Sequence, residues 1–316
     1  MDVDQLTRIA MEVIAPVILM AGVGFLLGGF RVVEPGPIVR VYMTVFAPAL
    51  AFKAWLDAEL SGDDLARVFL FGTIAVAVLY AIALAVSRGL GHDRGMRGAF
   101  LNSVIMYNSA NYGLPVQEMA FGHLGVVVQP LVLMTQNLIC FTLGPVNAAS
   151  NSPNLWMTLK QVLAMPLTWA LVAGGLIHSA GYTWDNLHDD YPMLWAPLDY
   201  FQRALVPVAL LSLGVQLSRV KLHGKVLNIA MACLLRLLVA PLVGLPVGLL
   251  LGIRGELLAI LVVSISFPSA VFASILATEF KNHEDFSAAV VFVSTIISIV
   301  TVTAVIYLSK VYLVPA

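Results

Sequence analysis

The sequence predicts an all-α membrane protein of ten transmembrane helices, arranged as two inverted repeats of five helices each. Three observations lead to this fold class. The chain of 316 residues is 60% hydrophobic and only 11% charged, whereas a soluble domain carries about 25% charged residues. Ten apolar runs are long enough to cross a bilayer, which takes about 20 residues of helix. Prolines recur at matching places in the two halves of the chain.

The ten predicted spans follow one another through short loops, and the mean hydropathy of the whole chain is +0.92. No loop is long enough to form a second domain, so the chemistry is expected in or beside the membrane. The predicted spans are residues 9–30, 38–56, 65–86, 98–121, 125–146, 158–180, 198–217, 227–253, 257–280 and 286–308.

Basic residues in the loops predict the orientation, because Lys and Arg collect on the cytoplasmic side of short loops. Loops on the opposite side are acidic, as in residues 57–64 and 185–190. Both termini are therefore expected on the extracytoplasmic side of the cell (inner) membrane. The acidic start, MDVDQLTR, lacks the basic region of a signal peptide, so the first run is expected to be a retained span. The two basic clusters that face the cytoplasm are Arg88, Arg94 and Arg97, and Arg219, Lys221 and Lys225.

The prolines indicate a repeat, with residues 1–146 as its first half and residues 158–316 as its second. Because each half has five spans, the second would cross the membrane upside down relative to the first. Inverted repeats with interrupted helices at matching positions are typical of secondary transporters. Chance is the alternative, since proline is common in membrane helices. The matched pairs are Pro16 and Pro166, Pro48 and Pro207, and Pro115 and Pro268.

Two apolar spans are interrupted by polar residues and proline, in MYNSANYGLPVQEMAFG (106–122) and VSISFPSAVFAS (263–274). Proline removes a backbone donor and clashes with the preceding turn. The carbonyls that this frees are costly in lipid unless they find partners. Aligning the two prolines sets Asn111 against Ser264 and Gly113 against Ser266. The expected partners of the freed carbonyls are Asn108, Asn111, Ser264 and Ser266.

The two breaks predict an anion site. Proline is a favoured first residue of a helix, so a second half-helix is expected to start at Pro115 and another at Pro268. A helix N-terminus carries free N–H groups and about half a positive charge, and two such ends would hold an anion between them. The substrate-binding candidates around the breaks are Asn108, Asn111, Gly113, Pro115, Gln117, Glu118, Ser264, Ser266, Pro268 and Ser269.

Four further polar residues inside the spans allow two interpretations each. Arg236 is either a counter-charge for the substrate or a structural bridge to freed carbonyls, because a central charge needs a cavity or a partner. Glu118 either carries a proton or is satisfied by backbone N–H groups near a helix start. Gln136 and Asn137 either bind a ligand or a broken helix, or serve in packing.

Other classes of function find no support. No zinc spacing, phosphate-binding glycine loop or Gly-x-Ser-x-Gly elbow occurs, and the six His residues are scattered. Both Cys residues lie in apolar runs, so no disulfide framework is expected. The net charge of −1 gives no basic arm for nucleic acid. We therefore expect no enzyme, no cofactor, no metal site and no nucleic-acid partner.

The pattern Asn108-x-x-Asn111-x-Gly113-x-Pro115 resembles the signature of the fourth span in the auxin efflux carrier family. Four more stretches resemble their counterparts in the same order: MPLTWALVAGGLIHSAG, LVPVALLSLGVQLS, LLRLLVAP with Arg236, and SISFPSAVFASILATEF with Pro268. The resemblance covers nearly the whole chain. Members of this family include plant auxin exporters and bacterial carriers of malonate, malate and similar acids.

The resemblance implies crossed, broken helices 4 and 9, a scaffold of spans 1, 2, 6 and 7, a transport domain of spans 3–5 and 8–10, and a homodimer. The short loop at residues 147–157 departs from many plant members and favours a bacterial-type organic acid carrier. The expected function is secondary or potential-driven transport of a small organic anion by alternating access, with a proton or sodium ion as coupling ion. The alternatives are a membrane sensor with the carrier fold and a sodium-coupled carrier of a related fold group.

Overall fold

The computed structural model describes residues 7–56, 62–149, 156, 160, 163–220 and 225–314, and the regular elements of this part are helices. The acidic loop at 57–61, much of the loop at 147–157, the start of the sixth predicted span and Lys221 lie outside it. The helices are η1 (Ile9–Ile14), α2 (Ala15–Gly29), α3 (Pro35–Val41), η2 (Tyr42–Phe46), α4 (Ala47–Leu56), α5 (Gly62–Gly89), α6 (Arg94–Ile105), η3 (Ser109–Gly113), α7 (Leu114–Ala149), α9 (Pro166–Ser179), α10 (Trp184–Asp190), α11 (Pro192–Leu217), α12 (Val226–Leu234), η4 (Leu235–Val239), α13 (Ala240–Leu250), α14 (Gly255–Ile265), α15 (Val271–Glu279) and α16 (Glu284–Tyr312), where η marks a π-helical turn.

Seven helical stretches of the described part are long and apolar enough to cross a membrane. The other predicted spans correspond wholly or partly to shorter helices, namely α6, α9, and the pair α14 and α15. The seven stretches are Met11–Gly29, Pro35–Leu56, Gly62–Gly89, Ser109–Ala148, Pro192–Leu217, Val226–Leu250 and Glu284–Tyr312.

The long stretch through α7 turns back on itself at Gly122. This glycine has φ 55° and ψ −133°, which a residue without a Cβ adopts readily. Beyond the turn, Gln129 Nε2 donates to the Ser109 carbonyl at 3.0 Å and Gln136 Nε2 donates to the Ile105 carbonyl at 3.2 Å. These contacts require the two arms to run antiparallel, so the turn falls where the sequence separates spans 98–121 and 125–146.

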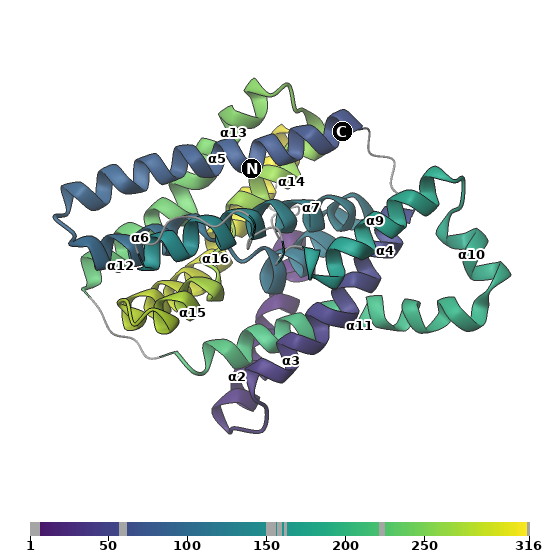
Figure 1. The fold of residues 1–316 in the computed structure, drawn as a ribbon, viewed down its shortest axis with the longest axis horizontal. Helices are drawn as coiled ribbons and strands as arrows, with labels where there is room; N and C mark the ends of the chain where they lie inside the picture. Colours follow the sequence, from purple (N-terminus) through teal and green to yellow (C-terminus); the bar gives the residue numbers. More distant parts are fainter. Residues whose placement is uncertain are drawn as a thin grey trace.

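The helices pack in two groups, and Figure 1 shows α2, α3 and α11 of one group below α5, α6 and α13 of the other. In one group α2 packs along α11 and α4 along α9, and α11 also contacts α3 and α10. The other group contains α5, α6, α7 and α12 to α16. A Cβ atom at Gly214 would lie 1.8 Å from the Ala21 carbonyl oxygen, so glycine is what lets α2 and α11 approach this closely. The groups meet where α4 and α11 contact α7, and where η1 contacts α16.

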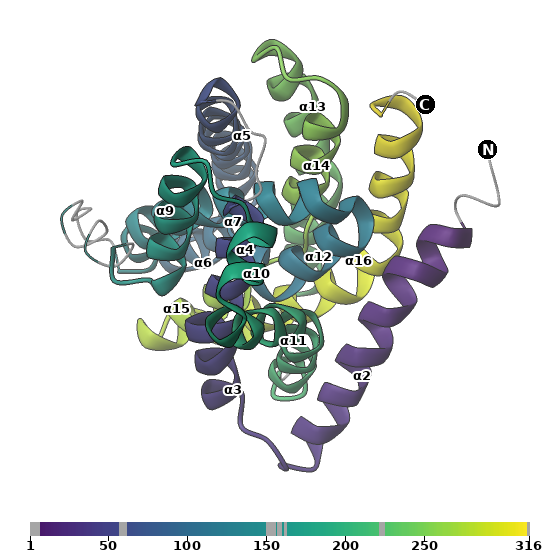
Figure 2. The same cartoon turned by 90° about the vertical axis from the view of Figure 1, so that its right-hand side faces the viewer.

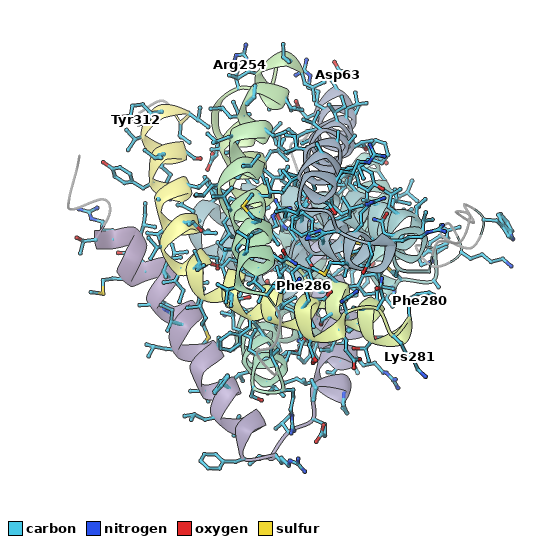
Figure 3. The ribbon with its side chains drawn as sticks, turned by 90° about the vertical axis from the view of Figure 1, so that its left-hand side faces the viewer. Asp63, Arg254, Phe280, Lys281, Phe286 and Tyr312 are labelled. Atoms are coloured by element: carbon cyan, nitrogen blue, oxygen red, sulfur yellow. The ribbon has the colours of Figure 1, made fainter. Side chains whose placement is uncertain are left out.

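The ends of the described chain lie together. Figure 2 shows the start of α2 and the end of α16 on the same side of the molecule, in agreement with the contact between η1 and α16. Figure 3 shows Asp63, Arg254 and Tyr312 at one end and Lys281 well away from them. This distribution agrees with the two faces expected from the loop charges, while their assignment to the sides of a cell membrane stays a prediction.

Helix α6, which leads into the first break, has a defined start. The Met96 backbone N–H donates to Asp93 Oδ1 at 2.8 Å, which caps the helix. This hydrogen bond lowers the pKa of the Asp93 carboxyl, because it favours the ionised form. The cap fixes the start of α6 at Arg94, and the helix then runs to Ile105, where the first break begins.

Candidate functional site

Two helical paths are interrupted inside the molecule. The first path ends as α6 at Ile105 and resumes as η3 at Ser109, continuing into α7. The second ends as α14 at Ile265 and resumes as α15 at Val271. Both interruptions are buried, so their backbone groups need partners within the protein.

The two interruptions supply partners for each other. Tyr107 and Ser269 form an antiparallel bridge. On either side of it, the Asn108 N–H donates to the Pro268 carbonyl and the Ala270 N–H donates to the Met106 carbonyl, each at 2.8 Å. The non-helical segments therefore cross as a very short two-stranded ladder, which we call the crossover.

The half-helices do not begin at the prolines, contrary to the sequence prediction. Pro115 is the second residue of α7, but the helical path already starts at Ser109, where the wide π turn closes with a bond from the Gly113 N–H to the Asn108 carbonyl at 2.9 Å. Pro268 lies in the crossover itself, three residues before α15 begins at Val271. Pairing between segments far apart in sequence, rather than proline, sets where these helices resume.

The predicted alignment of the two breaks is wrong as well. Ser264 lies in the last turn of α14 and Ser266 caps its end, before the break. Asn111 and Gly113 lie in η3, after the break. Setting the prolines against each other therefore paired residues from opposite sides of the two interruptions.

Arg236 occupies the space beside the crossover. It is fully buried in η4, and its Nη1 donates to the Val104 carbonyl at 2.7 Å while its Nη2 donates to the Ile265 carbonyl. Its guanidinium carbon lies 5.1 Å from the centre of the Tyr107 ring. One side chain thus ties together the ends of α6 and α14. This geometry is the structural bridge that the sequence left as one of two interpretations.

Two more side chains secure the interruptions. Ser269 Oγ donates to the Ser103 carbonyl at 2.6 Å, and the Ser269 N–H donates to Ser294 Oγ at 3.1 Å. Gln136 serves the freed Ile105 carbonyl, as described for the turn of α7. At the α6 end, Arg236 and Gln136 rather than the expected Asn108 and Asn111 serve the freed carbonyls. At the α14 end, the expected Ser264 and Ser266 donate to the carbonyls of Ile260 and Val263, at 2.8 and 2.6 Å.

A buried amide and hydroxyl cluster holds α7 against α14. Gln117 Nε2 donates to the Ile260 carbonyl at 2.9 Å and to Ser264 Oγ at 2.8 Å. Ser264 Oγ in turn lies 2.7 Å from Gln129 Oε1. Sequence reasoning missed Gln129, whose only signal is an amide in an otherwise apolar run seven positions after Gly122.

Glu118 lies apart from the crossover, on the arm of α7 that leads to the turn. It is partly buried, and its Oε2 has no hydrogen-bond partner among the described residues. Lys53 of α4 is the cation that acts on it electrostatically, although the Lys53 ammonium bonds Asp199 at 3.4 Å. Glu118 therefore sits where the two helix groups meet.

A cavity of about 200 Å³ adjoins the crossover. We call it the crossover cavity. Its walls include the first residues of both resumed helices, Ser109 of η3 and Val271 of α15. From the other helix group, Tyr42 and Gln216 line it. Four candidates from the sequence line this cavity, namely Asn108, Asn111, Gln136 and Asn137. The other candidates do not line it: Gly113, Pro115, Gln117, Glu118, Arg236, Ser264, Ser266, Pro268 and Ser269.

The crossover cavity can bind an anion without a charged side chain in its described lining. The first amides of a helix have no intrahelical acceptor, and here two helix starts share one wall. The Ser109 N–H itself already donates to the Tyr107 carbonyl at 2.9 Å, so the donors for an anion are the later amides of the first turn. Asn111 accepts a hydrogen bond from the Tyr42 hydroxyl through Oδ1, and Asn108 Nδ2 has no partner among the described residues. Sequence reasoning missed Tyr42, since no local pattern indicates a contact between residues 69 positions apart.

A second cavity of about 330 Å³ shares part of its lining with the crossover cavity, and we call it the vestibule. Gln216 and Val271 line both cavities. Further out, the vestibule is lined by exposed Glu284 and Asp285 of α16. Arg219 also lines it and forms an ion pair with Glu34 at 3.1 Å.

Comparison with known proteins places this geometry in a family. Residues 152–306 match the model of a family described as membrane transport proteins. An uncharacterized transporter from Methanothermobacter thermautotrophicus is 28% identical over 295 residues, which cover 92% of this chain and 95% of that protein. The second half of the chain thus matches the membrane transport protein family.

These two matches confirm the resemblance to auxin efflux carriers that the sequence motifs indicated. Together with the seven apolar helical stretches, they establish a multi-pass membrane protein that acts in transport. The matched region includes Arg236, the second break and the vestibule residues of α15 and α16.

Proposed function

We propose that this protein is a secondary carrier of a small organic anion, a mono- or dicarboxylate such as malonate, malate or an auxin-like acid. The anion binds in the crossover cavity and crosses by alternating access. The observation that carries this proposal is the shared wall of two helix starts, at Ser109 and Val271, beside the amides of Asn108 and Asn111.

The partial charges around the crossover cavity favour binding of an anion over binding of a cation. Two helix N-termini present partial positive charge, and the fully buried Arg236 lies beside Tyr107, which lines the cavity. No carboxylate lines the described part of the crossover cavity. A cation there would meet the positive ends of two helices, whereas a carboxylate would accept hydrogen bonds from amide groups already in place.

The two helix groups supply the moving parts of this proposal. The group with α2, α4, α9 and α11 acts as a scaffold, and the group with α5 to α7 and α12 to α16 carries the crossover as a transport domain. The expected ten spans in two inverted repeats, with crossed broken helices and both termini outside the cell, belong to this proposal, as does a homodimer. The vestibule would be the open side of the path in the structure described.

Two other functions remain as candidates from the sequence. A membrane sensor with this fold would bind the anion without net transport. A sodium-coupled carrier of a related fold group would transport a different class of substrate only with sodium. No specific contact among the described residues favours either of these two functions. One flux experiment distinguishes both of them from the proposed carrier.

That experiment measures uptake of radiolabelled malonate, malate and succinate into proteoliposomes, under a proton gradient, a membrane potential or a sodium gradient. The proposal predicts saturable uptake of at least one of these acids above protein-free vesicles. Uptake that needs sodium under every condition would favour the sodium-coupled alternative. Binding of an acid in detergent without flux under any gradient would favour the sensor.

A further inference from the structure

Gln216 lies on the boundary that the two cavities share. Only two described residues, Gln216 and Val271, line both the crossover cavity and the vestibule. Gln216 lies on α11 of one helix group, and Val271 is the first residue of α15 in the other. A solute that moved from one cavity into the other at this boundary would pass between the two helix groups.

The carboxamide of Gln216 is the only polar side-chain group of this pair. Its Nε2 donates to the Ser212 carbonyl at 3.1 Å and to Ser212 Oγ at 3.0 Å, one turn earlier on the same helix. These bonds hold the side chain along α11, and Gln216 is only partly buried. By giving up one of its two bonds to Ser212, this neutral amide can donate to a passing carboxylate without retaining it as a fixed cation would, and a path for ions needs such weak binding.

From this geometry, and resting on the proposed transport function, we propose that Gln216 is a specificity-determining residue. It admits carboxylates through the neck between the crossover cavity and the vestibule. Because Gln216 and Val271 belong to different helix groups, movement of one group against the other closes this neck. Sequence reasoning did not single out Gln216, which lies at the end of a span before a basic loop and looks interfacial there.

The two native thiols allow a direct test of the path. Cys140 lines the crossover cavity, and Cys233 lines a separate apolar groove between α12 and α16. In a Cys233→Ser background, a small uncharged reagent such as methyl methanethiosulfonate should reach Cys140 through the neck. Gln216→Trp should slow the modification of Cys140 by about tenfold or more. A tenfold slower rate corresponds to an activation barrier that is higher by about 1.4 kcal/mol.

A matched control uses the other thiol. Thr301 lines the groove that contains Cys233, so Thr301→Trp should protect Cys233 in a Cys140→Ser background. In a Cys233→Ser background, Thr301→Trp should leave Cys140 as reactive as before. If Cys140 reacts equally fast with and without Gln216→Trp, the path does not run past Gln216 and the proposal is overturned. This readout needs no substrate, so it remains decisive even if no organic acid is transported.

A second variant separates polarity from bulk and guards against a misfolded tryptophan variant. Gln216→Leu keeps the side-chain size, so Cys140 should react at the unaltered rate. Carboxylate uptake should fall by about fivefold or more, because losing one hydrogen bond to the passing carboxylate costs about 1 kcal/mol. The fall should appear in kcat, and the equilibrium affinity of the crossover cavity should stay the same. Unchanged carboxylate flux in Gln216→Leu would overturn the role in specificity.

Discussion

Replacing Arg236 with Ala distinguishes a structural bridge from a binding cation. In the structure its guanidinium donates to the carbonyls of Val104 and Ile265 and is fully buried. Removing it leaves two buried acceptors without donors, at about 1–3 kcal/mol each. We therefore expect a loss of about 2–6 kcal/mol in the free energy of unfolding, which corresponds to a fall in Tm of roughly 5–20 °C.

The assay is thermal unfolding of purified protein in detergent without ligand, followed by intrinsic fluorescence. Arg236→Lys should recover part of the loss, because a point-charge ammonium can serve one carbonyl but lacks the planar fork. Arg219→Ala is the matched control, since its ion pair with Glu34 is exposed and such pairs contribute about 0.2–1 kcal/mol. If Arg236→Ala unfolds like the unaltered protein while its affinity for anions falls, Arg236 is a counter-charge and the bridge reasoning is refuted.

Three more variants test the site and its access path. Asn111→Leu should weaken anion binding about five- to 150-fold by calorimetry, the equivalent of about 1–3 kcal/mol; an equal loss in Tyr42→Phe would mean that Asn111 acts only through its bond to Tyr42. Glu118→Gln should abolish the pH dependence of uptake and keep binding, and an unchanged pH profile would remove Glu118 from proton coupling. Neutralising both vestibule carboxylates, with Glu284→Gln and Asp285→Asn, should speed anion access from that face by about tenfold at most at low ionic strength. Because salt screens exposed charges, a gain that persists at high salt would contradict this electrostatic origin.

The apolar spans could be predicted from composition and run length, because lipid demands long stretches of helix whose backbone is satisfied locally. The turn at Gly122 falls between two predicted spans, and both interruptions lie in the segments where polar residues and proline break an apolar run. These features depend on local sequence. The residue types within each segment were therefore enough to predict the turn and the two interruptions.

The register of the crossover could not be predicted in the same way. Pro115 and Pro268 are the strongest local signals, yet helices resume at Ser109 and Val271. The deciding bonds join residues far apart, as in the bridge between Tyr107 and Ser269. A proline marks where a helix can start, whereas the partner segment decides where it does.

The cavity lining was only partly foreseeable for the same reason. Asn108 and Asn111 stood out as amides next to a break, and both line the crossover cavity. Tyr42 and Gln216 lie in helices of the other group and meet the site only after folding. Arg236 was conspicuous as a buried charge, but its choice between bridge and counter-charge depended on where the carbonyls of two other helices end.

The most direct test of the central claim is a structure determined with a transported organic acid bound. The account predicts the carboxylate in the crossover cavity, within hydrogen-bonding distance of Asn108 or Asn111 and beside the helix starts at Ser109 and Val271. A carboxylate more than about two helical turns, roughly 11 Å, from both helix starts would contradict the crossover cavity as the substrate site.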